Sequence, residues 1–428
     1  MKTSRHFSVR FRLSLMIFLE FAVWGCWLTS LGNYLGRSGM GTMIAWFFAM
    51  QGIWSLITPT LMGYIADRWT SPSRLLALCH LLYACAMGSA GYYGVMHVQP
   101  EFWPLFILFS IALAFFMPTI ALANSVAFKS LRSAGLDTGR YFPQIRVFGS
   151  VGFIAAMLLV NFTQFQTNAW QLMASAAIAF IMGIYSLTLP DTDNNPADTS
   201  TLSKDKISIL QVLSNKYILI FLAFAMLMGV AQQVTNSYGN IFISSFGRIS
   251  EYADAWASNN ANALISISQI SETICILLIP IALKKLGLKR VIFISMLAWT
   301  LRFWLYSIGN PGTGLWALIL SCIVYGVAFD FLSIAGGIYV DRIAGPHHRA
   351  KAQGMLMGAG NGIGGTIGIL IAQLVVNNLV FSQKAPEAQL SGWTSAWFIF
   401  GCYTLVVAVL FLIFFREGGK ESGLQDRH

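Results

Sequence analysis

The stretch "SCIVYGVAFDFLSIAGGIYV", residues 321–340, decides the fold class of this 428-residue chain. It is mostly apolar, and about twenty such residues in an α-helix cross the hydrocarbon layer of a bilayer, which is about 30 Å thick. Asp330 is the only charged residue in it. A charge at that depth is costly unless it faces protein or water, so Asp330 is a candidate functional residue.

Apolar runs of similar length recur along almost the whole chain. Hydrophobic residues make up 56% of the sequence and charged residues only 10%, against roughly a quarter charged in a soluble domain. We therefore predict an all-α integral membrane protein with twelve transmembrane helices. The predicted spans are 13–35, 42–65, 74–96, 103–127, 144–163, 169–189, 217–243, 258–283, 290–308, 315–339, 352–379 and 393–415.

The net charge of +10 is distributed unevenly between the two sides of the predicted membrane protein. Most of the 27 Lys and Arg residues fall in the N-terminus, the even-numbered connections and the C-terminus. This asymmetry follows the positive-inside rule and predicts that both termini are cytoplasmic. The basic charge thus orients the chain and requires no nucleic-acid partner.

Cysteine and histidine give no sign of a metal centre. The six cysteines all fall inside predicted spans without C-x-x-C spacing, and the six histidines are scattered along the chain. Small packing residues are the more frequent role of such cysteines. We expect no metal and no cofactor.

A polar connection, "DTDNNPADTSTLSKDKIS" at residues 191–208, separates six predicted spans from six more. Its composition is typical of a flexible linker. We predict an N-terminal six-helix bundle (1–190), a cytoplasmic linker (191–214), a C-terminal six-helix bundle (215–416) and a cytoplasmic tail (417–428).

A weak internal repeat supports this division. The sequences "TSLGNYL" (29–35) and "TNSYGNIF" (235–242) place Gly-Asn near the outer end of the first span in each half. Repeats of this kind favour a duplicated transporter architecture, with a site between the halves at mid-membrane depth.

The connection "GYIADRWTSPSR", residues 63–74, resembles the loop signature of the major facilitator superfamily, although residues 69–73 depart from its usual glycine and basic pattern. The functional interpretation is that Asp67 and Arg68 pair across cytoplasmic helix ends and act as a gating loop. A simple surface ion pair at a turn is the alternative.

Five charged residues fall at bilayer depth, inside the predicted spans rather than at their first residues: Glu20, Arg146, Glu272, Arg302 and Asp330. Polar and aromatic residues accompany them at helical spacing, in the sets Arg146, Ser150 and Phe153; Gln233 and Asn236; Gln269 and Glu272; and Tyr325 and Phe329. Amides bond hydroxyls and carbonyls in both senses, and rings offer stacking area. Such stripes suit a small polar ligand with a flat part, for which a nucleoside and a sugar both remain open.

In order and spacing, the segments "WGCWLTSLGNYL", "FPQIRVFGSVGF", "QQVTNSYGN", "SISQISET" and "IVYGVAFDF" resemble the bacterial nucleoside:proton symporter family of the major facilitator superfamily. The resemblance implies two pseudo-symmetric six-helix bundles and proton-coupled uptake of nucleosides across the cell inner membrane by alternating access. It implies a substrate site of Arg146, Ser150, Phe153, Gln233, Asn236, Gln269, Glu272, Tyr325 and Phe329. Ser150 stands where the family also uses threonine, which leaves base preference open.

For proton coupling the resemblance points to Asp330 and Glu272. Glu20 is a further candidate, either a second protonation site or a packing acid bonded to a neighbouring helix. Asp330 either takes and releases a proton or forms a permanent ion pair, with Arg146 or Arg302 as the cation.

We expect a functional monomer in the lipid bilayer that binds a nucleoside and protons and is not an enzyme. A transporter of another polar solute, such as a sugar or a modified nucleoside, is the first alternative. A membrane receptor or enzyme is a remote one, because the connections are short and contain no nucleophile and base motif.

Overall fold

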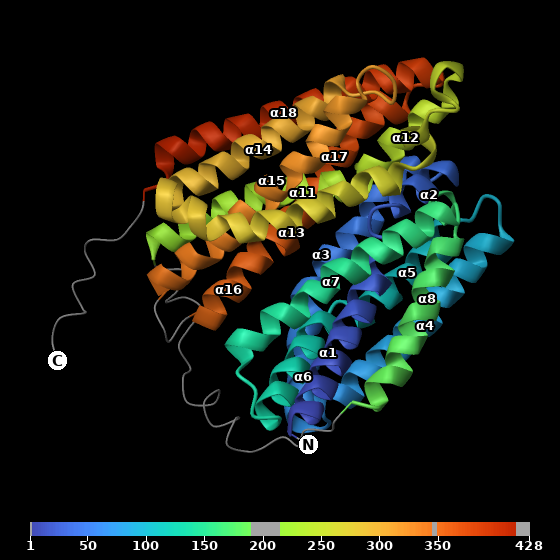
Figure 1. Ribbon diagram of the computed structural model, residues 1–428. Helices are drawn as coiled ribbons and strands as arrows, with labels where there is room; N and C mark the ends of the chain where they lie inside the picture. Colours follow the sequence, from blue (N-terminus) through green and yellow to red (C-terminus); the bar gives the residue numbers. More distant parts are fainter. Residues whose placement is uncertain (1, 190–214, 345–348, 417–428) are drawn as a thin grey trace. The chain divides into compact units, whose positions relative to one another are not determined.

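The computed structural model describes residues 2–189, 215–344 and 349–416, and these residues form helices and turns without any strand (Figure 1). The predicted linker, 191–214, and the predicted tail, 417–428, lie outside the described residues.

The helices follow the predicted spans closely along most of the chain. They are α1 (Lys2–Gly25), α2 (Leu31–Arg37), α3 (Ile44–Arg68), α4 (Pro72–Met96), α5 (Phe102–Phe116), α6 (Thr119–Ser133), α7 (Thr138–Phe162), α8 (Trp170–Leu187), α11 (Lys216–Ser245), α12 (Trp256–Asn259), α13 (Ala261–Leu286), α14 (Leu288–Ile308), α15 (Leu315–Ala344), α16 (Arg349–Met357), α17 (Gly365–Val376) and α18 (Pro386–Phe414). Two π-helical segments, Gly358–Gly364 and Asn377–Phe381, adjoin α17. Within the described ranges, 11 helical stretches are long and apolar enough to cross a membrane.

Two predicted spans are interrupted. The span predicted at 13–35 is α1 followed by a turn at residues 26–30 and then α2, and it is not among those 11 stretches. The span predicted at 103–127 is two helices, α5 and α6, separated by Met117 and Pro118. Proline lacks the backbone N–H that continues a helix, and its ring clashes with the preceding turn, so it accounts for the second interruption.

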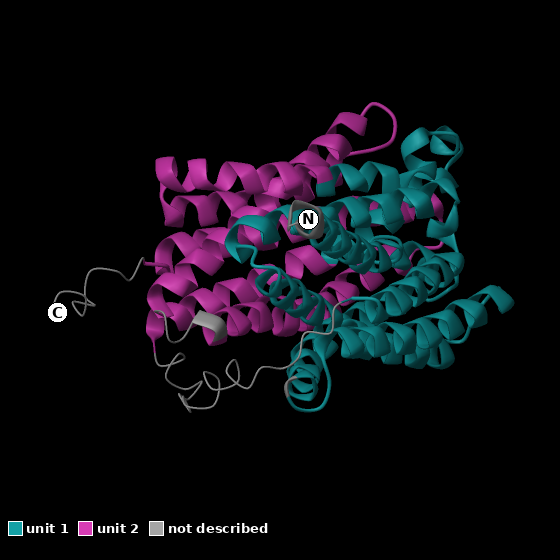
Figure 2. Cartoon of the chain, turned by 60° about the horizontal axis from the view of Figure 1, so that its bottom comes forward, with its two compact units in different colours: residues 1–205, 234–269 teal, residues 206–233, 270–428 magenta. Residues whose placement is uncertain are grey.

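The chain divides into two compact units (Figure 2). Unit 1 comprises residues 1–205 and 234–269, and unit 2 comprises residues 206–233 and 270–428. The division falls inside two continuous helices, α11 and α13. The predicted bundles, 1–190 and 215–416, meet at the linker instead, so their boundaries differ from those of the two units. The division into six helices and six helices remains a prediction.

Close packing of α1 against α7 organises unit 1. A Cβ atom at Gly152 would lie 2.1 Å from the backbone oxygen of Phe18, and one at Gly25 would lie 2.5 Å from that of Phe153. Both glycines thus allow backbone-to-backbone contact, as small residues do between membrane helices. Elsewhere in unit 1, α4 packs against α8 and α5.

Aromatic side chains fill the centre of unit 2, where α14 packs against α15 and α18. The rings of Phe303 and Trp397 stack with centroids 5.7 Å apart, and Tyr306 meets Trp397 edge-on at 4.9 Å. The Thr300 and Thr404 hydroxyls bond at 3.0 Å between α14 and α18. Such ring pairs add to the burial of apolar area.

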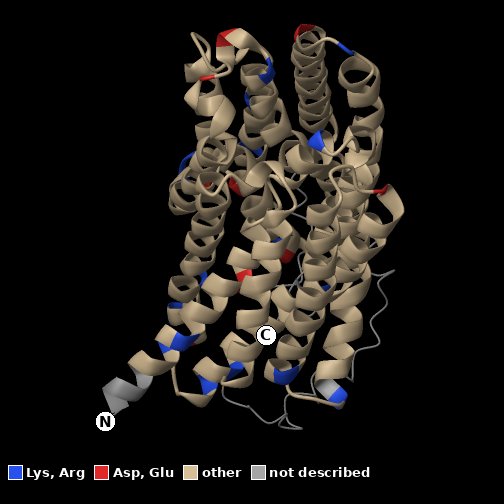
Figure 3. Cartoon of the chain, turned by 90° about the vertical axis from the view of Figure 1, so that its right-hand side faces the viewer, with Lys and Arg blue, Asp and Glu red and all other residues tan. Residues whose placement is uncertain are grey.

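Large apolar side chains are also exposed along the helices. On α13 alone they include Ile270, Ile274, Leu277 and Ile281. Figure 3 shows that most of the helix length has neither Lys, Arg, Asp nor Glu. Apolar surface of this extent marks contact with a membrane, so the outer faces of the helices suit lipid.

The α1–α7 contact gives a first prediction. Gly152→Ala should destabilise the protein by about 1–3 kcal/mol, because the new methyl group meets backbone that moves only if the helices separate. Thermal unfolding in detergent should show a lower midpoint. Gly63→Ala in α3 is the matched control, since nothing lies within 4 Å of a Cβ there. Equal midpoints for the two variants would contradict the contact.

Candidate functional site

Glu272 and Asp330, the predicted coupling acids, lie in unit 2 on helices in close contact. A Cβ atom at Gly326 of α15 would lie 2.5 Å from the backbone oxygen of Ser271 in α13, and the Ser271 hydroxyl donates to the Ile323 carbonyl. Glu272 follows Ser271, and Asp330 lies one turn beyond Gly326 on the same helix. The charges of the two acids interact electrostatically. The glycine therefore brings the two predicted coupling residues into one neighbourhood.

Asp330 is 2% exposed, and its Oδ2 has no hydrogen-bond partner among the described residues. Gln233 is also buried, and its Oε1 likewise has no hydrogen-bond partner among the described residues. Buried polar atoms are normally hydrogen-bonded, and exceptions often mark functional positions. Both residues belong to the predicted site and to unit 2.

Aromatic rings continue the site along α15 and α14. Tyr325 and Phe329, predicted to share a helix face, stack with centroids 5.8 Å apart and planes 4° apart. Trp299 meets Tyr325 edge-on at 5.7 Å. The Arg302 guanidinium lies 4.6 Å from the Tyr325 ring centroid and donates to the Ser321 carbonyl at 2.6 Å. A pairing of Asp330 with Arg302 or Arg146 stays a prediction.

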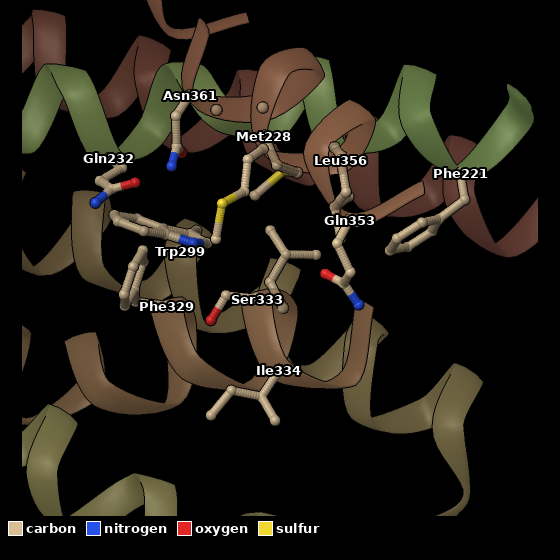
Figure 4. Close-up of a pocket in the computed structure, with 15 residues that line it drawn as sticks. Phe221, Met228, Gln232, Trp299, Phe329, Ser333, Ile334, Gln353, Leu356 and Asn361 are labelled. Carbon is tan, nitrogen blue, oxygen red and sulfur yellow. The ribbon is translucent and has the colours of Figure 1, made fainter. Parts of the chain in front are cut away.

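A cavity of about 350 Å³ opens beside these rings within unit 2 (Figure 4). The figure shows the Gln232 and Asn361 amides near the Trp299 and Phe329 rings, with Phe221 and Leu356 towards the other end. Cavities of roughly 300–1,000 Å³ with apolar walls and a few polar groups are typical small-molecule sites.

Sequence reasoning missed six polar or aromatic residues of this cavity: Phe221, Gln232, Trp299, Ser333, Gln353 and Asn361. Gln353 is held by bonds of 2.8 Å from its Nε2 to the Gly337 carbonyl and to Asp341 Oδ1. Spacing gave a partial signal for Trp299, which lies three residues before Arg302 on α14, and for Gln232, which lies four residues before Asn236 on α11.

Unit 1 holds the predicted residues of α7. The Arg146 guanidinium lies 4.0 Å from the centre of the Phe21 ring, and the Phe153 ring meets Trp24 edge-on at 6.3 Å. Arg146 and Phe153 therefore both contact aromatic residues of α1. Ser150 lies between them on α7 and is half-buried.

The remaining predicted residues of unit 1 are placed by their helices. Asn236 is buried on α11 and Gln269 is half-buried on α13. Arg68 ends α3, with its guanidinium 4.6 Å from the Tyr64 ring centroid. The side chain of Asp67 lies outside the described part of the chain, so the gating pair stays a prediction.

Glu20 has a partner that the sequence did not reveal. Its Oε2 lies 3.2 Å from Nε2 of His80 on α4, and its Oε1 accepts a 2.5 Å hydrogen bond from the Thr119 hydroxyl of α6. All three side chains are at most 1% exposed. Glu20 thus joins α1, α4 and α6 in the interior of unit 1.

Amide side chains form a second polar group in unit 1, which we call the asparagine cluster: Asn33, Gln166, Asn240 and Asn262. Asn33 Nδ2 donates to Asn240 Oδ1 at 2.9 Å, and Asn240 Nδ2 donates to Asn262 Oδ1 at 2.9 Å. Gln166 Oε1 accepts from the Asn262 backbone N–H at 3.2 Å. The two asparagines of the internal repeat, Asn33 and Asn240, therefore bond directly to each other.

Arg37 and Gly32 border this cluster. Arg37 Nε donates to Asn33 Oδ1 at 3.2 Å, and burial together with nearby Arg248 lowers the pKa of its guanidinium. A Cβ atom at Gly32 would lie 1.9 Å from the Ser237 backbone oxygen, so α2 and α11 touch backbone to backbone. The amide bonds and the glycine contact together fix α2 against the second part of α11.

Comparison with known proteins assigns the family. The family model described as "Nucleoside H+ symporter" matches residues 7–420. The chain belongs to the nucleoside H⁺ symporter family. Xanthosine permease of Escherichia coli K12 is 38% identical over 427 residues, covering 98% of this chain and 99% of that protein. Nucleoside permease NupG of the same strain is 36% identical over 419 residues, 96% of each chain.

Solved structures agree with this assignment. A crystal structure of the nucleoside transporter NupG matches with a TM-score of 0.85 at 34% identity, covering 95% of this chain and 99% of that one. A crystal structure of a D-xylose-proton symporter matches at 17% identity with a TM-score of 0.63, which shows the shared fold alone. The symporter thus has the predicted major facilitator fold, and its family consists of transporters rather than enzymes.

The asparagine cluster of this symporter gives a second prediction. Asn240→Ala should remove the bonds to Asn33 and Asn262 and leave buried amides unpaired, at a cost of about 1–3 kcal/mol. Hydrogen exchange should therefore become faster in residues 31–37, which α2 contributes to the contact. Asn259→Ala, at an exposed position of the same unit, should leave that exchange unchanged. Protection of α2 that survives Asn240→Ala would show that the amides do not hold it.

Proposed function

We propose that this chain is a proton-coupled nucleoside importer of a bacterial inner membrane that works by alternating access. The observation that supports it most directly is the cavity of unit 2, where two aromatic rings and two amides face the same space. Family membership over residues 7–420 gives the reaction class.

The chemistry of the cavity suits both parts of a nucleoside. A base has a flat π-face that stacks on Trp299 or Phe329, and such stacking contributes about 1–3 kcal/mol per base. The Gln232 and Asn361 amides donate and accept, as the hydroxyls of a ribose or the edge of a base require. Gln233, next to Gln232 in sequence, does not line this cavity, and its buried Oε1, unpartnered among the described residues, is a further candidate acceptor of the predicted site.

Glu272 and Asp330 are the proposed coupling acids. Their charges interact, so the protonation of one depends on that of the other. Asp330 directly follows Phe329, which lines the cavity. A ligand that stacks on Phe329 therefore changes the surroundings of the adjacent carboxylate, which supports coupling between substrate and proton.

Several finer features belong to the same proposal. They are cytoplasmic termini, a functional monomer, six-helix bundles joined at residues 191–214, a gating role for Asp67 and Arg68, and substrate contacts from Arg146, Ser150, Phe153, Asn236 and Gln269. The positive-inside asymmetry of the sequence supports the orientation. A sugar as substrate is not favoured, because the closely similar relatives are nucleoside and xanthosine permeases.

The test is uptake of labelled uridine and adenosine into proteoliposomes. An imposed inward proton gradient should drive accumulation above the external concentration. Asp330→Asn and Glu272→Gln should abolish accumulation while the protein remains folded and inserted, because an amide does not titrate. If the gradient changes neither nucleoside's uptake by the wild-type chain, proton-driven transport of these nucleosides is excluded. Full accumulation in both variants would exclude the acids from coupling.

The cavity gives a separate prediction about affinity. Phe329→Ala should weaken nucleoside binding roughly tenfold to a hundredfold, the equivalent of about 1–3 kcal/mol of lost stacking. Isothermal titration with the purified protein measures it. Phe180→Ala, at an exposed position of α8, should bind like the wild type. Unchanged affinity in Phe329→Ala would place the base elsewhere.

A further inference from the structure

Unit 1 contains a buried acid–base pair that the proposed site in unit 2 does not use. Glu20 is 1% exposed and His80 is 0% exposed, and the atoms that face each other are Oε2 and Nε2, 3.2 Å apart. A buried ionisable residue in a membrane helix is expensive and usually functional. The pair therefore needs a chemical explanation.

The partners of the pair determine how many protons it holds. His80 Nδ1 lies 3.2 Å from the Leu76 carbonyl oxygen, which only accepts, so Nδ1 carries a hydrogen. Glu20 Oε2 and His80 Nε2 are 3.2 Å apart, yet neither atom has a hydrogen-bond partner among the described residues. One proton, carried either by Oε2 or by Nε2, is what the pair needs to bring these two atoms into a hydrogen bond. Without it, two lone pairs would face each other in a site closed to water.

The other oxygen of Glu20 lies at the start of α6, directly after a proline. Thr119, which donates to Oε1, is the first residue of α6, directly after the interruption at Met117 and Pro118. Helix N-termini stabilise negative charge. Met117 and Pro118 keep right-handed helical backbone angles, so Pro118 kinks the span beside Glu20 rather than unwinding it. The surroundings of Glu20 thus accommodate the carboxylate as well as the acid.

Few other ionisable groups face the pair. Cys79 and Tyr83 of α4 are close enough for their charges to interact with Glu20. From α1, Cys26 interacts with Tyr83, and from α7, Arg146 lies over the ring of Phe21, the neighbour of Glu20 in sequence. Helix α5 has no ionisable residue, α8 has only Tyr185, and Lys129 and Arg132 lie more than two turns beyond Thr119 on α6.

We propose that Glu20 and His80 share one proton and form a second proton-binding site of the transport cycle, within unit 1. The inference rests on the proposed function, since it adds a proton to the coupled reaction. A coupling proton must be held out of contact with both solutions during part of the cycle, and the complete burial of the pair provides this. The proton passes from water on one side to the pair, where it forms an O–H or N–H bond, and that bond breaks when the proton returns to water on the other side.

The experiment compares the number of protons moved per nucleoside in wild-type and variant proteoliposomes. It is obtained from the membrane potential that balances a fixed nucleoside gradient, since each additional proton adds the same electrical work. Glu20→Gln is the main variant, because its amide N–H can donate to His80 Nε2 and keep the contact without a titratable proton. His80→Gln, whose amide nitrogen takes the place of Nε2, is the second variant if the first does not fold.

The proposal expects the ratio to fall by one proton in either variant, while nucleoside binding by titration is retained. For a change from two protons to one, the balancing potential roughly doubles. Ser175→Ala is the matched control: it removes the bonds of Ser175 to Tyr83 and to the Val23 carbonyl on the same helices, and its ratio should equal that of the wild type.

The outcomes separate this inference from the proposed function. An unchanged ratio in a folded Glu20→Gln or His80→Gln protein would show that the pair is structural only, and would leave proton-driven uptake intact. Absence of gradient-driven uptake by the wild-type chain would overturn the proposed function, and this inference with it.

Discussion

The hydrocarbon of a bilayer offers no hydrogen bonds, and this constraint decides where the polar side chains of the symporter lie. A buried polar group must be satisfied by another part of the protein or by a ligand. In unit 1 the amides of the asparagine cluster bond to one another and Glu20 Oε1 accepts from Thr119, while Glu20 Oε2 and His80 Nε2 face each other without a hydrogen bond among the described residues. In unit 2, Asp330 Oδ2 and Gln233 Oε1 also lack partners in the described part of the chain. Each unit thus keeps buried polar atoms that a proton or a ligand can satisfy.

Glycine sets the distances at which this pairing is feasible. Backbone contact at Gly152 joins α1 to α7, contact at Gly32 joins α2 to α11, and contact at Gly326 joins α13 to α15. Each contact lies near a polar group: Arg146 on α7, Asn33 on α2 and Asp330 on α15. The absence of a side chain at these glycines thus lets the helices approach closely, and this approach decides which polar side chains can meet.

The sequence was sufficient to predict most of the spans. It also identified residues that are charged within an apolar run or that recur at helical spacing. Asp330 stood alone in an apolar run, and Tyr325 and Phe329 stack as their spacing predicted. The pairing of Asn33 with Asn240 depends on contacts between distant helices, so the repeat located both residues without showing the bond. Nothing in the sequence pairs His80 with Glu20, because the two residues lie 60 positions apart and meet only in the fold. The span predicted at 103–127 was taken as continuous although it contains Pro118. Gln232 lies four residues before Asn236 on α11, but neither Gln232 nor Asn361 carries a charge, so the cavity is what identifies them.

The asparagine cluster is built from uncharged amides, with Arg37 only at its edge. Dissolved ions screen the attraction between charges but act weakly on bonds between neutral dipoles. Amides also neither gain nor lose protons over the range in which carboxylates and imidazoles titrate. The contact between α2 and α11 therefore keeps the same strength in dilute and in salty surroundings, and on the acidic and the neutral side of a membrane.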